Sequence, residues 1–156
     1  MLKIELHTHT DEDPADLIDH STRDLIDRAA ALGYGALAIT LHDRYFDPAP
    51  HAEYARGRGL VLMAGIERTI GSRHVLLINF PARVAAVRSF DDIAALKQET
   101  TGLVVAPHPF YPIPSALGTD LDQFFDFMLP MEGSQRVRSA VGSRQSKVEG
   151  RLPTAD

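Results

Sequence analysis

Short apolar runs separated by polar segments mark most of the chain. Four of these runs are continuous and have the length of a buried strand: residues 36–40, 60–64, 75–78 and 103–106. A shorter strand is expected at residues 3–7, where Ile4 and Leu6 are apolar. A further strand is expected to begin at residues 127–129.

The segments between these runs have the spacing of amphipathic helices. In the clearest of them, residues 21–32, apolar side chains recur at helical intervals: Leu25, Ile26, Ala29 and Leu32. Ser21 is expected to cap the start of this helix, with Asp24 three residues on, and Gly33 to end it. A weaker helix is expected at residues 49–57, and further helices are expected at 91–100 and 120–127. Alternating buried strands and helices predict an α/β domain with parallel strands.

The chain is expected to hold one domain, followed by a polar tail. Its 156 residues are 44% hydrophobic, enough for one ordinary globular core. After residue 132, Gly, Ser, Arg and Gln dominate. We therefore assign residues 1–132 to the domain and residues 133–156 to a tail that is either part-helical around 139–147 or disordered.

Composition and charge narrow the function. The chain has no cysteine, which excludes disulfides and thiolate metal sites. No apolar run reaches the ~18 residues of a membrane-spanning helix, and the first residues do not form a signal peptide, so a cytoplasmic protein without a membrane partner is expected. With 21 acidic against 16 basic residues, a broad nucleic-acid-binding face is not expected. A small phosphorylated substrate fits, because a metal cluster can supply positive charge locally.

Histidine and glutamate side chains gather at the ends of the expected strands. The residues concerned are His7, His9, His42, Glu67, His74 and His108. The C-terminal ends of parallel strands meet at one edge of a sheet or barrel, where active sites lie. Neutral imidazoles together with a bridging carboxylate suit Zn, Mn or Fe, whereas Ca or Mg alone prefers more oxygen ligands. The sequence therefore predicts a metal centre.

Five segments carry a more specific pattern: Leu6–Thr10, Ala36–Asp43, Gly65–Glu67, His74–Leu76 and Pro107–Pro109. In their order and spacing they resemble successive motifs of the polymerase-and-histidinol-phosphatase (PHP) family, across residues 1 to about 132. The resemblance implies a distorted (β/α)7 TIM-like barrel, here incomplete at its C-terminal end. It also implies two or three divalent metal ions and the hydrolysis of phosphate esters.

The resemblance further implies which residues bind each metal. His7, His9 and Glu67 would hold the first ion. Glu67 would bridge to a second ion held by His74 and His108. His42 would belong to a third position, together with a residue of the loop that follows His9.

That loop offers several candidates. The residues usual in the family at this point are replaced. Counting back from the helix start at Ser21 makes Asp16 the expected ligand and His20 the alternative. The remaining acidic residues of the loop, Asp11, Glu12 and Asp13, are expected to be solvated. Glu5 either orients a ligand imidazole or lies on the surface, and His51 is expected to be structural or exposed.

Several further residues are candidates for the chemistry itself. Arg68 and Arg73, and also Arg44, are next to expected ligands in the sequence and could hold phosphate oxygens through their forked donors. Solvated surface positions are the alternative for each of them. His42 could act as general acid if the third metal position is empty.

Two departures from the family pattern leave a second interpretation open. The usual Thr-Asp-His is here Thr40-Leu41-His42, and no Asp-x-His motif follows His108. The alternative is therefore a catalytically inactive PHP-like domain that acts as a metal-binding or interaction module. An incomplete barrel would also expose strand edges, which favours a homo-oligomer.

Overall fold

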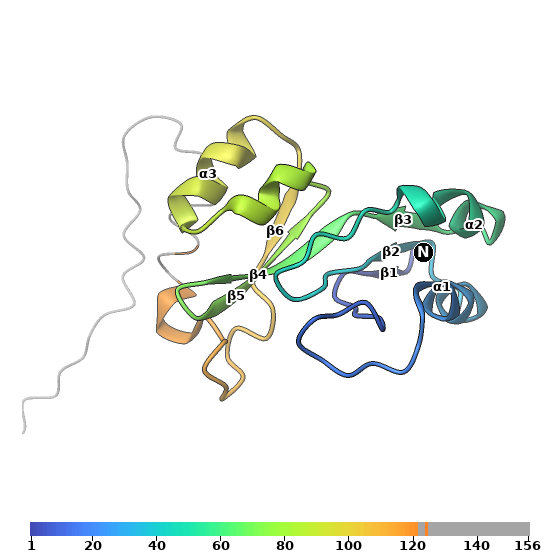
Figure 1. Ribbon diagram of the computed structural model, residues 1–156, viewed down its shortest axis with the longest axis horizontal. Coiled ribbons are helices and arrows are strands. Elements are labelled where there is room, and N and C mark those ends of the chain that lie inside the picture. Colours follow the sequence, from blue (N-terminus) through green and yellow to red (C-terminus); the bar gives the residue numbers. More distant parts are fainter. Residues whose placement is uncertain (122–123, 125–156) are drawn as a thin grey trace, which may run out of the picture.

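The computed structural model describes residues 1–121 and residue 124 (Figure 1). Within them, the strands form two three-stranded sheets. The first sheet is parallel, in the order β1 (Ile4–Glu5), β2 (Ala36–Ala38) and β3 (Val61–Met63). The second is antiparallel, in the order β4 (Gly65–Ile70), β5 (Arg73–Ile78) and β6 (Leu103–Val105).

In the described part of the chain, three α-helices accompany the sheets: α1 (Thr22–Ala31), α2 (Ala52–Gly57) and α3 (Phe90–Gln98). Short 3-10 turns lie at η1 (Ala49–His51), η2 (Ala82–Ala86) and η3 (Gly118–Asp120). The predicted cap of the first helix is confirmed: Ser21 accepts from the backbone N–H of Asp24, and the Asp24 carboxylate accepts from the Ser21 backbone. Ser89 and Asp92 form the same capping box at the start of α3.

The predicted barrel is wrong: the described residues form two small separate sheets and no closed barrel. The chain reverses directly between β4 and β5 through Gly71 and Ser72, whose φ angles are +54° and +70°. Positive φ at both central residues is the geometry of a tight hairpin turn. A barrel of parallel strands needs a crossover connection there. The hairpin therefore makes β4 and β5 antiparallel neighbours.

Strand β4 itself was not expected. The sequence pattern ended a strand at Ala64 and placed Glu67 in the loop after it. In the structure, residues 65–70 pair with β5 over their whole length, from Gly65↔Ile78 to Ile70↔Arg73. Polar Glu67, Arg68 and Thr69 interrupt the apolar pattern of this strand, which concealed it.

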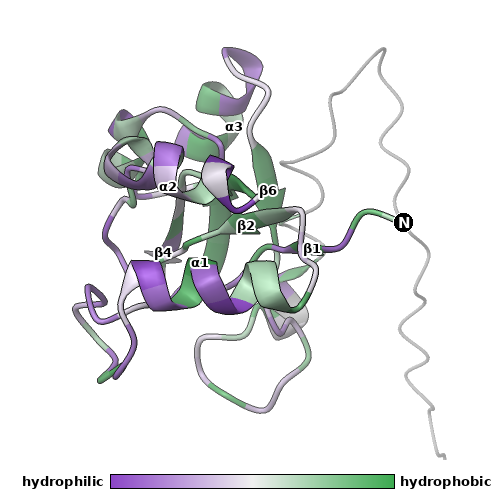
Figure 2. Ribbon diagram, turned by 90° about the vertical axis from the view of Figure 1, so that its right-hand side faces the viewer, coloured by the Kyte–Doolittle hydropathy of each residue, from purple (hydrophilic) through white to green (hydrophobic). Residues whose placement is uncertain are grey.

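Alternating side chains of the strands divide the core into clusters. From β2, Leu37 packs with Ile26 of α1, whereas Ala38 packs with Leu76 and Ile78 of β5. The opposite face of β5, including Leu77, packs in the cluster that contains residues of α3. Figure 2 colours β2 and β6 as hydrophobic strands, whereas α1 carries both polar and apolar residues. Residues from both sheets thus share one small cluster, which joins the two halves of the fold.

The remaining predictions concern membrane-spanning helices, the C-terminal segments and oligomerisation. Among the described residues, none of the helices has the length and apolar character needed to cross a membrane. The proposed tail at 133–156, the strand at 127–129 and most of the helix at 120–127 lie outside the described residues. The expected homo-oligomer stays a prediction.

Candidate metal centre

Glu67 is the central carboxylate of the site, and its side chain is only 1% exposed. It lies on β4 beside the loop that follows β2. The Glu67 backbone N–H donates to the Leu41 carbonyl at 3.0 Å, and its carbonyl accepts from the Asp43 backbone N–H at 2.8 Å. These two bonds pair His42 with Glu67 in a parallel bridge. The loop that follows β2 in the parallel sheet is thus hydrogen-bonded to β4, the first strand of the antiparallel sheet.

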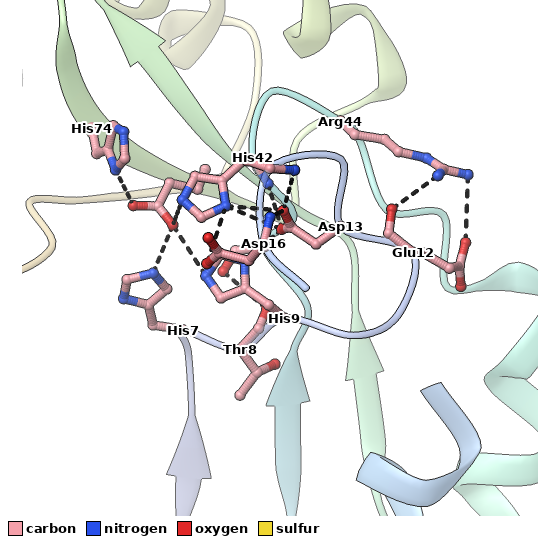
Figure 3. A network of polar contacts seen from close by, with 12 residues as sticks. His7, Thr8, His9, Glu12, Asp13, Asp16, His42, Arg44 and His74 are labelled. Carbon is pink, nitrogen blue, oxygen red and sulfur yellow. Dashed lines mark hydrogen bonds and ion pairs between the residues drawn. The ribbon is translucent and has the colours of Figure 1, made fainter. Parts of the chain in front are cut away.

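Three imidazoles face the Oε2 atom of Glu67 (Figure 3). Oε2 lies 2.8 Å from His7 Nε2, 3.2 Å from His9 Nε2 and 3.6 Å from His42 Nε2. The Glu5 side chain does not touch an imidazole; it accepts from the backbone N–H groups of Leu6 and His7. Glu5 therefore shapes the backbone at the end of β1.

The segment that carries His7 and His9 is held beside β2 by the threonine between them. Thr8 Oγ1 donates to the Ala38 carbonyl at 2.7 Å, and the Thr8 carbonyl accepts from the Thr40 backbone N–H at 2.8 Å. Thr8 therefore points toward β2, and the two flanking histidines point toward Glu67, as period-two alternation requires.

Two further imidazoles face the other oxygen of Glu67. Oε1 lies 2.6 Å from His74 Nδ1 and 3.6 Å from His108 Nε2. The His74 backbone N–H donates to the Ser115 carbonyl at 2.8 Å, which ties the segment after His108 to β5. His108 has a φ of +34°, and its buried Nδ1 atom has no hydrogen-bond partner. The structure thus brings five predicted histidine ligands around the two oxygens of one buried carboxylate.

Asp13 is the functional candidate that the sequence interpretation missed. Its side chain is fully buried, so the expectation of a solvated position is wrong for this residue. Oδ1 accepts from the backbone N–H groups of Ala15 at 2.8 Å and Asp16 at 3.0 Å. Oδ2 lies 2.7 Å from His9 Nδ1 and accepts from the His42 backbone N–H at 2.9 Å. Asp13 therefore sits behind two of the imidazoles that face Glu67.

A local sequence signal for this position did exist. Asp13 precedes Pro14, and an Asp-Pro pair favours the start of a turn. An aspartate at the start of a turn accepts hydrogen bonds from the backbone two or three residues further along. The turn explains the two bonds to Oδ1. It carries no information about His42, which lies on a distant part of the chain.

The two preferred loop candidates lie nearer the edge of the site. Asp16 is 56% exposed on its side chain, and its Oδ2 is 3.9 Å from His42 Nδ1 (Figure 3). His20 is exposed, and its Nε2 lies 3.0 Å from the His9 carbonyl. Asp11 is exposed as expected, and Glu12 pairs with Arg44 at the surface. His51 is part-buried and stacks on the ring of Phe46.

Arg68 and Arg73 are adjacent to ligand candidates in the sequence but on the opposite face of their strands. Successive residues of a strand point to opposite faces, so Arg68 points away from Glu67 and Arg73 away from His74. Arg68 pairs with Asp43 and donates to the Val87 carbonyl. The catalytic role predicted for these arginines stays a prediction, and their observed bonds are structural.

Replacing Arg73 by alanine is expected to lower the free energy of unfolding by about 1–3 kcal/mol, because charged hydrogen bonds would be lost. Its guanidinium pairs with Asp120 and donates to the carbonyls of Pro114 and Ala116. Urea unfolding of Arg73→Ala measures this loss. Arg83→Ala, which removes an exposed ion pair, is the control and should change stability little. Equal losses in both variants would contradict the role of Arg73.

Charge distribution at the site favours ionised carboxylates. Burial raises the pKa of Glu67, but hydrogen bonds to His7 and His9 outweigh it and hold that pKa well below its usual range. Burial also raises the pKa of Asp13, but hydrogen bonds from the His42 backbone and from His9 outweigh it and hold that pKa well below its usual range. Burial lowers the pKa of His9, yet its bonds to Glu67 and Asp13 raise it overall. Two buried negative charges therefore require compensating positive charge.

The donor atoms fit divalent metal ions. Three groups of side chains each place their ligand atoms within 4.8 Å of one another: His7, His9 and Glu67; His9, Asp13 and His42; and His42, Glu67 and His74. All the donors are imidazole nitrogens or carboxylate oxygens, the set that suits Zn, Mn or Fe. The described residues can thus bind a metal ion, without specifying which one.

No protein-family model matches this chain, and no curated protein matches it significantly. The resemblance of its motifs to the PHP family therefore stays a prediction.

Proposed function

We propose that this chain is a metal-dependent hydrolase that cleaves the phosphate ester of a small metabolite or nucleotide, as its PHP-like motifs suggest. One observation carries the proposal. Glu67 is almost completely buried, and imidazole nitrogens face both of its oxygens. A carboxylate in this position serves as a bridge between two metal ions better than as an isolated buried charge.

The proposal assigns two sides of the centre to metal binding. His7, His9 and the Oε2 atom of Glu67 would hold one ion. His74, His108 and Oε1 would hold the other. When bound, such ions supply the charge that attracts phosphate oxygens and lowers the pKa of a water molecule. Without that charge, the ionised carboxylates of the centre would repel a phosphate.

His42 is the group best placed to move a proton. Its Nδ1 lies 3.1 Å from both oxygens of Asp13, so the ring is held by hydrogen bonding at that nitrogen. Its Nε2 is turned toward the centre, and 18% of the side chain is exposed. Held in this way, a protonated His42 would deliver a proton to the leaving-group oxygen. It would do so when it does not itself bind a metal.

A second candidate, a metal-binding module without catalysis, has one observation in its favour. The guanidinium groups of Arg68 and Arg73 are already bound to carboxylate and carbonyl groups of the protein. Neither is free to clamp a phosphate. If metal binds but no ester is hydrolysed, this second function is the correct one.

The proposed function is tested on the metal-stripped chain. Manganese and zinc are titrated into it by calorimetry, which gives the stoichiometry. Hydrolysis of p-nitrophenyl phosphate and of bis-p-nitrophenyl phosphate is then followed with each metal. Metal-dependent turnover supports the phosphoesterase. An absence of metal binding would overturn both candidates.

Metal addition is also expected to stabilise the fold. At ~100 times the dissociation constant, binding adds about 2.7 kcal/mol, which raises the melting temperature of a domain of this size by about 5–11 °C. Differential scanning fluorimetry with zinc or manganese measures this shift. Calcium, which prefers all-oxygen sites, is the control and should produce a much smaller shift. Equal shifts with all three ions would contradict a histidine-rich site.

A further inference from the structure

Asp13 touches two imidazoles from behind, on the side away from Glu67. Its Oδ2 is 2.7 Å from His9 Nδ1, and both its oxygens are 3.1 Å from His42 Nδ1. On each ring the other nitrogen, Nε2, faces Glu67 Oε2, at 3.2 Å for His9 and 3.6 Å for His42. One buried carboxylate thus contacts the same nitrogen on both rings (Figure 3).

The contact with Asp13 affects which nitrogen of each imidazole carries the proton. A neutral imidazole carries its proton on one nitrogen and a lone pair on the other. A carboxylate only accepts, so it selects the ring form whose proton faces it. In His9 and His42 each ring nitrogen faces a carboxylate, Glu67 at Nε2 and Asp13 at Nδ1. A ring that gives the lone pair of Nε2 to a metal ion can keep its proton only on Nδ1, where Asp13 accepts it. The lone pairs then point toward the centre, where a metal would bind.

Asp13 has little capacity left to bind a metal itself. A carboxylate offers about four lone-pair positions. Backbone N–H groups from Ala15, Asp16 and His42 occupy three of them, and His9 Nδ1 faces a further one. His42 Nδ1 is shared between both oxygens. The acceptor positions are therefore filled within the protein.

We infer that Asp13 is a positioning residue that fixes His9 and His42 in the Nδ1–H form, so that Nε2 of each can bind metal. The inference rests on the proposed metal centre. It assigns Asp13, rather than the exposed Asp16, as the acidic residue of this loop on which metal binding depends most. The turn after Pro14 supports this role, because the backbone N–H groups of Ala15 and Asp16 donate to Oδ1 and hold the carboxylate in place.

Asp13→Asn is the decisive variant, because it keeps the shape and replaces one acceptor oxygen by an NH2 donor. If the amide oxygen faces Ala15 and Asp16, the NH2 group faces His9 Nδ1. His9 must then accept at Nδ1 and carry its proton on Nε2, where it can no longer bind metal. Asp11→Asn removes the same charge from an exposed position of the same loop and is the matched control.

Two measurements test the inference. Long-range 1H–15N NMR of the zinc-loaded wild type should show the proton of His9 and of His42 on Nδ1 and the metal on Nε2. Calorimetric titration with zinc should show about 10–100-fold weaker binding for Asp13→Asn, as for other partners of ligand histidines, and no change for Asp11→Asn. The wild-type spectrum decides the ring form even if Asp13→Asn folds poorly.

The outcomes separate this inference from the proposed function. Unchanged zinc affinity in Asp13→Asn would overturn the role of Asp13 and leave the metal centre intact. Coordination through Nδ1 in the zinc-loaded wild type would make Asp13 a direct ligand and also overturn it. A wild type that binds no zinc removes the metal centre, and the inference with it.

Discussion

Replacing Glu67 by alanine is expected to abolish detectable metal binding and to lower hydrolysis by on the order of 10³-fold or more. Metal charge stabilises a phosphoryl-transfer transition state by several kcal/mol, and ~4 kcal/mol corresponds to that factor. Glu67 has a carboxylate oxygen within 3.6 Å of nitrogens on both sides of the centre. Its loss therefore affects both proposed metal positions at once. Metal titration and ester hydrolysis measure the effect.

Two controls make this prediction specific. Glu67→Gln keeps the size of the side chain but removes its charge, and it should lose metal binding nearly as completely as alanine. Glu53→Ala removes an exposed glutamate from α2 and should leave both measurements unchanged. If Glu67→Ala kept wild-type metal affinity, the histidines alone would bind the metal and the bridging role of Glu67 would be lost.

Substituting Gly65 by alanine is expected to lower the free energy of unfolding by about 1–3 kcal/mol, the range of overpacked positions. A Cβ atom there would lie 2.5 Å from the Ile39 carbonyl oxygen and 2.8 Å from Thr40 Cγ2. The first neighbour is backbone, so the chain segments themselves must separate. Gly65 also accepts from the Phe46 backbone N–H, within the same junction between the sheets.

The same substitution is expected to weaken metal binding, because Glu67 lies two residues farther along β4. Urea unfolding and zinc titration of Gly65→Ala measure the two effects. Gly57→Ala is the control: nothing lies within 4 Å of its Cβ position, and alanine favours the end of α2. The prediction fails if Gly65→Ala is as stable as the wild type, since the close contact would then relax without cost.

Much of the local structure could be read from the sequence. The apolar spacing and the Ser21–Asp24 pair placed α1 within a residue or two of its observed bounds. Continuous apolar runs located β2, β3, β5 and β6, because buried strands need apolar side chains on both faces. These features depend on residues that are close together in the chain, so they can be recognised from the sequence alone.

Residue chemistry was also visible in the sequence. The predicted histidines and Glu67 do converge in the structure, although the fold that gathers them is not the predicted one. The barrel was wrong because the direction of β5 depends on the turn at Gly71 and Ser72. An apolar run is equally compatible with parallel and antiparallel pairing.

The sequence by itself thus determined the helices, most strands and the kinds of side chain at the centre. Only the tertiary structure decided which of them meet. It buried Asp13 between His9 and His42, and it turned Arg68 away from the centre by strand alternation. The physical reason is that contacts between distant segments depend on strand direction and on backbone bonds across the two sheets, which no local pattern of residues records.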